Sequence, residues 1–203
     1  MKMMKTLAAI PLLLFSTGAM AQSVKVTKGD FTALKSEKTV DVDFVYSDMI
    51  VGKDLTNDQY IEKKTKEYNE KEPGRGDTWA ASWVSDRERL FHPKFFELYN
   101  KVLEGTQTAS QEDGSAKYRL IVHTTRTEPG FNVGVMSRPA GIDVKIQLVE
   151  VSDPGKILGE MTMVNCPGAN AMGFDYDTGG RIAEAYAKMG KELASFLRKK
   201  AFK

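Results

Sequence analysis

The fold of this 203-residue chain is decided by one stretch of its sequence, Ile142-Asp143-Val144-Lys145-Ile146-Gln147-Leu148. Apolar and polar residues alternate through all of it, which is the period of a β-strand with one buried face and one face in water. The turn sequence Ser152-Asp153-Pro154-Gly155-Lys156 follows, and an apolar run returns over residues 157–164. These features predict a β-hairpin, and the polar alternate positions favour an antiparallel sheet.

Two earlier segments share this alternation and predict further strands. One contains Tyr118, Leu120 and Val122, and the other runs from Val40 to Tyr46. Near the C-terminus, Asp177 or Thr178 can cap a helix with an apolar stripe. The stripe consists of Ile182, Tyr186, Met189, Leu193, Phe196 and Leu197. We expect Val144, Ile146 and Leu148 to pack against Tyr186, Met189 and Leu193.

The middle of the chain has helical spacing. Residues 55–72 predict a helix that Asp54 or Thr56 caps and that Pro73-Gly74 ends. Residues 79–103 predict two successive helices with an interruption at His92-Pro93. The element order is therefore β, two or three helices, β, β, β, α. This order predicts an α+β fold, with a mostly antiparallel or mixed sheet and helices packed on one face.

The first 21 residues have the features of a signal peptide. Lys2 and Lys5 precede an apolar run, and Ala19-Met20-Ala21 is a small-x-small cleavage site before Gln22. The run is about half the ~20 residues needed to span a bilayer, which favours a signal peptide over a membrane span. The alternative is an N-terminal helix that is retained for a membrane or a partner. No later segment approaches that length. We therefore expect a single domain over residues 22–203, exported to the periplasm or outside the cell and carrying no lipid, because no cysteine follows the cleavage site.

Composition excludes some partners. The whole chain has 29 basic and 27 acidic residues, so loss of Lys2 and Lys5 leaves 27 of each. A formal charge of zero provides no long-range field for nucleic acid. The single Cys166 cannot form an internal disulfide, and in an exported protein such a cysteine is more often buried than reactive.

We find no catalytic motif and no metal or cofactor site in the sequence. His92 precedes a proline at a helix junction, where a capping or surface role is expected, and His123 lies on a strand face with Arg119. Asp175-Tyr176-Asp177 is better explained by helix capping than by cation binding. Arg75-Gly76-Asp77 matches an adhesion tripeptide, but a tight turn between helices is the simpler explanation.

Two long connections, residues 126–141 and 165–177, are the candidate binding surface. If the three C-terminal strands are sequential neighbours, both connections leave the sheet at the same end. Both are longer than the usual ~4–6 residues. They carry apolar side chains among glycines, of which we select Phe131, Val133, Met136, Met172, Phe174 and Tyr176 as binding residues. The alternative is that these side chains cover the end of the sheet and that part of 131–135 is an edge strand.

The C-terminal half also resembles a known group of proteins. Glu128-Pro129-Gly130, the strand 142–151 and the segment Pro154-Gly155-Lys156-Ile157-Leu158-Gly159 carry the likeness, which spans about residues 117–200. The pattern resembles uncharacterised exported bacterial families, similar in outline to periplasmic assembly-lipoprotein domains of the curli-secretion and penicillin-binding-protein-activator types. Glu150-Val151 replaces the usual aspartate, and the lipid-carrying cysteine is missing. The resemblance implies an α/β fold, a non-enzymatic envelope role and no catalytic residues.

Two classes of function follow. The first is an exported, non-catalytic binding or assembly domain of a bacterial envelope that acts through protein contacts, including contacts with further copies of itself. The second is a small secreted hydrolase whose active site is assembled from residues far apart in the sequence. The first is favoured, because no nucleophile and base are recognisable.

Overall fold

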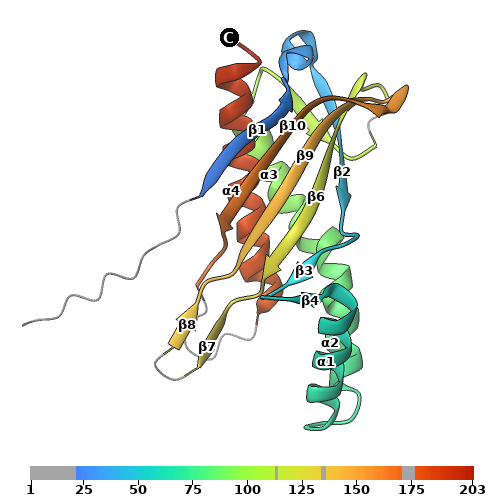
Figure 1. Ribbon diagram of the computed structural model, residues 1–203, viewed down its shortest axis with the longest axis vertical. Helices are drawn as coiled ribbons and strands as arrows, with labels where there is room; N and C mark the ends of the chain where they lie inside the picture. The colour runs from blue at the N-terminus through green and yellow to red at the C-terminus, as the bar shows by residue number, and fades with distance from the viewer. Residues whose placement is uncertain (1–21, 113, 134–135, 171–176) are drawn as a thin grey trace, which may run out of the picture.

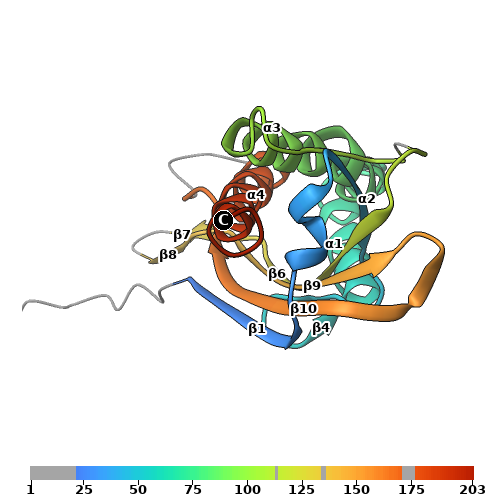
Figure 2. The same cartoon turned by 90° about the horizontal axis from the view of Figure 1, so that it is seen from above.

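The computed structural model describes residues 22–112, 114–133, 136–170 and 177–203. They form the predicted α+β fold, an open mixed sheet with helices on one face (Figures 1 and 2). The strand order in the main sheet is β1-β10-β9-β6-β2-β5. Its strands are β1 (Ser23–Gly29), β2 (Thr39–Val45), β5 (Thr108–Ser110), β6 (Tyr118–Glu128), β9 (Gly141–Glu150) and β10 (Asp153–Pro167).

The predicted hairpin is present and forms the centre of the sheet. β9 pairs antiparallel with β10 on one side and with β6 on the other, so the three strands are sequential neighbours. β1 adds an antiparallel edge beside β10, whereas β2 runs parallel to both β6 and β5. Two short strands, β3 (Ile50–Val51) and β4 (Leu55–Thr56), extend the sheet beside the end of β6.

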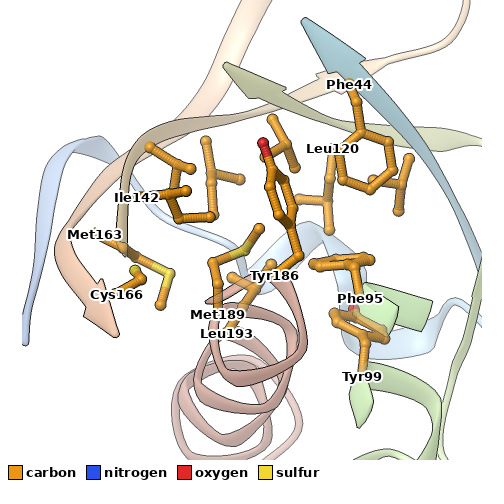
Figure 3. Close-up of a cluster of buried hydrophobic side chains, with 14 of the residues drawn as sticks. Phe44, Phe95, Tyr99, Leu120, Ile142, Met163, Cys166, Tyr186, Met189 and Leu193 are labelled. Carbon is orange, nitrogen blue, oxygen red and sulfur yellow. The ribbon is translucent and has the colours of Figure 1, made fainter. Parts of the chain in front are cut away.

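The helices cover the face on which the apolar residues of the strands lie. They are α1 (Asn57–Asn69), α2 (Arg75–Asp86), the π-helical turn η2 (Arg87–Phe91), α3 (His92–Val102) and α4 (Thr178–Lys200), with a short 3₁₀ turn η1 (Thr32–Ser36). α3 and α4 lie over the sheet (Figure 2). Tyr186, Met189 and Leu193 extend from α4 into the core (Figure 3), which also contains Val144, Ile146 and Leu148, as expected.

The helix starts follow from their caps. Thr56 and Gln59 form a capping box at the start of α1, in which each side chain accepts a hydrogen bond from the other's backbone N–H. The Asp177 side chain accepts a hydrogen bond from the Gly180 N–H and caps α4. Both caps were among the predicted alternatives.

The predicted break at His92-Pro93 is instead a change of helical pitch. α2, η2 and α3 follow one another without a gap, and the His92 N–H donates to the carbonyl of Arg87. Pro93 lies at the start of α3, where its missing N–H is tolerated. Wider π-helical turns of this kind are frequent at functional sites.

Three further details depart from the sequence expectations. β1 and η1 were not predicted. Asp41, on the polar face of β2, is only 2% exposed because it forms an ion pair with Arg119 at 3.1 Å. The small residues Ala183, Ala187, Gly190 and Ala194 predict from sequence that the last helix approaches its sheet closely. At Gly190 the close approach is instead to α3, since a Cβ there would lie 2.6 Å from the carbonyl oxygen of Phe95.

α1 and α2 form an arm, residues 57–86, that extends beyond the end of the sheet (Figure 1). Four aromatic rings pack within it, those of Tyr60, Tyr68, Trp79 and Trp83. Arg75-Gly76-Asp77 forms the first turn of α2 and not a loop. Gly76 is buried, and its Cα lies so close to α1 that a Cβ would meet the carbonyl oxygen of Thr65.

Candidate functional site

The two long connections leave the sheet together, as the topology predicted. At their bases the Gly168 N–H donates to the carbonyl of Ala140 at 2.8 Å, and the Ala140 N–H donates to that of Ala169 at 3.1 Å. In the sheet itself, Pro167 of β10 faces Gly141 of β9. Residues 126–128, assigned to the connection from sequence, are instead the end of β6.

The first connection folds into a separate hairpin, β7 (Phe131–Val133) and β8 (Met136–Arg138), which we call the β7–β8 hairpin. It projects beyond the lower end of the main sheet (Figure 1). Phe131 is 39% exposed and Met136 is 64% exposed. The strand alternative for part of 131–135 is therefore correct for Phe131–Val133. The side chain of Val133, together with Met172, Phe174 and Tyr176, lies outside what the structure describes.

Glu128 holds the base of the hairpin. One of its carboxylate oxygens accepts the Gly130 N–H at 3.1 Å, and the other accepts a guanidinium N–H of Arg138, also at 3.1 Å. Gly130 has φ of +73°, and a Cβ there would lie 2.8 Å from the backbone nitrogen of Ala140. The hairpin is thus pre-organised by contacts at its base.

A buried arginine lies beneath the same base. Arg181, in the first turn of α4, is only 6% exposed, and its guanidinium donates to the carbonyl of Pro129 at 3.4 Å and to the hydroxyl of Thr178 at 3.1 Å. The sequence did not predict a role for this residue. An arginine directly before the apolar stripe of α4 indicates a buried polar contact, but the sequence pattern does not show which group it contacts.

A second ion pair ties the ends of the strands together. Arg126 of β6 pairs with Asp143 of β9, with 2.6 Å between its Nε and the carboxylate, and Asp143 also accepts the Asn165 N–H at 2.7 Å.

We call the region formed by Arg126, Glu128, Arg181 and the β7–β8 hairpin the hairpin corner. Its charged side chains are engaged in ion pairs and hydrogen bonds within the corner, and its exposed side chains include the apolar Phe131 and Met136 beside Arg138.

The candidate catalytic side chains are not arranged as a nucleophile and base. Cys166 is fully buried, and burial raises the pKa of its thiol to about 12. His123 contacts Gln147 across the sheet, with 3.2 Å between the ring nitrogen and the amide oxygen. His92 is buried and hydrogen-bonds Tyr46 at 3.0 Å. Within the described ranges, no group of three His, Cys, Asp or Glu side chains could hold a metal ion.

No helix in the described part of the chain is long and apolar enough to cross a membrane. No protein-family model matches the sequence, and no curated protein matches it.

Several solved structures are similar at low identity. The PelC dodecamer of Paraburkholderia phytofirmans is 13% identical, with a TM-score of 0.36 over 84% of this chain and 98% of that one. Protein XCC0632 of Xanthomonas campestris, from the family DUF330, is 12% identical, with a TM-score of 0.40 over 78% and 82%. A neuraminyllactose-binding hemagglutinin homolog from Helicobacter pylori is 13% identical, with a TM-score of 0.34 over 84% and 87%. These likenesses are too distant to assign a function to this chain, and none of the three is of the curli-secretion or penicillin-binding-protein-activator type.

Proposed function

We propose that this chain is an exported, non-catalytic binding protein of a bacterial envelope that acts through protein contacts at the hairpin corner. One observation carries the proposal: a hairpin that projects from the body exposes Phe131 and Met136, while Glu128 holds its base in place. Projecting apolar side chains on a pre-organised element are typical of protein recognition.

The chemistry of the corner favours a protein partner over a small charged ligand. Arg126 and Arg138 are both paired with carboxylates, and Arg181 is buried. Methionine and aromatic side chains are enriched where proteins meet, because they adapt to a partner and bury a large area. The partner is another envelope protein or a further copy of this chain.

Export is part of the same proposal. Every described helix and strand lies within residues 23–200, so cleavage before Gln22 leaves them all intact. Among the described residues, Cys166, His92 and His123 are far from forming a nucleophile and base, which favours a binding role.

The test compares two variants with the same kind of change. Phe131→Ser with Met136→Ser removes both exposed side chains of the hairpin, and Val151→Ser is the matched control. Val151 is as exposed as Phe131, at 39%, but lies at the β9–β10 turn at the opposite end of the sheet (Figure 1). Light scattering on the purified chain measures self-association, and a photo-crosslinker at position 136 captures other partners in the native host.

We expect the hairpin variant to lose self-association or the crosslinked adduct, while the control keeps it and the melting temperature of both stays near that of the parent chain. Equal loss in the control would contradict the proposal. A large fall in melting temperature for the hairpin variant alone would show that these side chains are core.

A further inference from the structure

The buried histidine at the junction of the arm and the body is a group that the proposed function does not use. His92 is 7% exposed, and its ring stacks on that of Phe44, with 4.0 Å between ring centres and 10° between planes. Its Nε2 lies 3.0 Å from the Tyr46 hydroxyl. Its other ring nitrogen, Nδ1, is buried and makes no hydrogen bond of ordinary geometry, although the Gln111 side chain lies near the ring.

Behind Tyr46, a chain of hydroxyls continues into the core. Tyr46 interacts with Tyr186 of α4, and the Tyr186 hydroxyl lies 2.6 Å from that of Thr124 in β6. These hydroxyls can reverse their donor and acceptor roles, so either tautomer of neutral His92 can be satisfied at Nε2. A second proton is different. An imidazolium carries N–H groups on both nitrogens and a full charge, and the ring is only 7% exposed, so little water reaches it to offset that charge.

The same ring system connects to the arm. The Arg87 guanidinium stacks on Tyr46, with its central carbon 4.3 Å from the ring centre, and donates to the side-chain oxygen of Asn57 at 3.1 Å. The indole N–H of Trp83 donates to that same oxygen, also at 3.1 Å. His92, Tyr46 and Arg87 therefore link the sheet to the first residue of α1 and to the end of α2.

We propose that His92 is an acid-sensitive joint: uptake of one proton from solvent onto its buried ring disrupts the contact with Tyr46 and loosens the attachment of the arm. Four neighbouring side chains affect how readily the ring takes up a proton. Arg87 opposes the added charge, whereas Glu88 on η2, Asp43 on β2 and Gln111 after β5 favour it. Desolvation is the largest effect, and it lowers the pKa of His92 below its ordinary 6.5.

The sign of the pH dependence follows from that direction. The neutral ring is the form that fits the joint, so the joint is intact above pH 6.5. The unfolded or loosened chain binds the proton more readily, so the attachment weakens as the pH falls below 6.5 towards the lowered pKa. This inference does not depend on the hairpin corner binding a partner.

The composition of the chain makes the test unusually direct. The sequence has only two tryptophans, Trp79 and Trp83, and both lie in the arm, so fluorescence excited selectively at the tryptophans reports on the arm. It has only two histidines, and the second, His123, lies on the sheet face away from α3 and α4. Fluorescence is recorded from pH 8 to pH 4 for the parent chain, for His92→Phe, which keeps an aromatic ring to stack on Phe44, and for His123→Gln as the matched control.

We expect a reversible fluorescence transition with a midpoint below pH 6.5 in the parent chain and in His123→Gln, and its loss in His92→Phe. A transition that survives in His92→Phe, or that disappears in His123→Gln, would overturn the proposal. If His92→Phe does not fold, NMR titration of the parent chain decides. The proposal requires the His92 ring and the tryptophan indole N–H signals to shift with one midpoint below 6.5, and it fails if His92 titrates at 6.5 or above or if the indole signals do not follow it.

Discussion

At the scale of single residues, the apolar residues that alternate along β9 are the ones that are buried. Ile146 of β9 and Leu193 of α4 are both fully buried in the core between sheet and helix. Truncating either to Ala removes apolar contacts and leaves a cavity, so we expect Ile146→Ala and Leu193→Ala each to lower the free energy of unfolding by about 2–5 kcal/mol. Urea denaturation measures the loss. Val151→Ala, at an exposed position, should change it by less than about 0.5 kcal/mol.

The burial of Cys166 also has a measurable consequence. Its pKa of about 12 leaves on the order of a thousandfold less thiolate at pH 8 than an unperturbed cysteine would have. We therefore expect iodoacetamide to modify the folded chain very slowly and the urea-unfolded chain rapidly. Rapid alkylation of the folded chain, followed by mass spectrometry, would show that the thiol is accessible and would reopen the hydrolase alternative.

At the scale of elements, the close contact between α3 and α4 depends on one missing methyl group. A Cβ at Gly190 would lie 2.6 Å from the backbone oxygen of Phe95, which cannot move without shifting α3. Gly190→Ala should cost about 1–3 kcal/mol, the usual range for overpacking. Gly155→Ala is the control, since a Cβ there meets only a side-chain oxygen at 3.7 Å. Equal melting temperatures for the two variants would contradict the packing described.

The elements that the sequence predicted are those whose burial has a regular period. Burial alternates along β6, along β9 and in the middle of β10, and α1 and α4 also carry recognisable caps. Periodicity does not encode strand direction, so the parallel pairing of β2 could not be predicted. β1 is an exposed edge strand that buries too little to leave a strong pattern.

The hairpin corner was only partly predictable, for the same reason. Its location followed from topology, and the exposure of Phe131 and Met136 agrees with the prediction of apolar side chains on that surface. The supports were not predicted. Glu128 meets Arg138 only because the hairpin brings them together, and the other contacts, made by Glu128 and Arg181, are with the backbone of residues 129 and 130. Contacts with backbone leave no pattern in the partner's sequence.

At the scale of the whole molecule, the two ends of the sheet differ. The lower end carries both the β7–β8 hairpin and the arm, and the other end carries the β9–β10 turn (Figure 1). Tyr60 of the arm also lies near the hairpin corner. Burial is the main cause of a raised pKa for Tyr60 of α1, and among the smaller influences Glu128 raises this pKa and Arg181 lowers it. The arm and the hairpin corner are therefore neighbours at the lower end of the sheet.

The proposed export requires that the chain lose its first 21 residues. Cleavage before Gln22 leaves β1 intact beside β10, so a chain of residues 22–203 should keep its full melting temperature. A chain that begins at residue 30 lacks β1 and exposes the edge of β10, so it should melt at a lower temperature and aggregate. Mass spectrometry of the protein from its native host should find Gln22 or Ser23 at the N-terminus. Intact Met1 on most of the protein would show that it is not processed, and export would have to be abandoned.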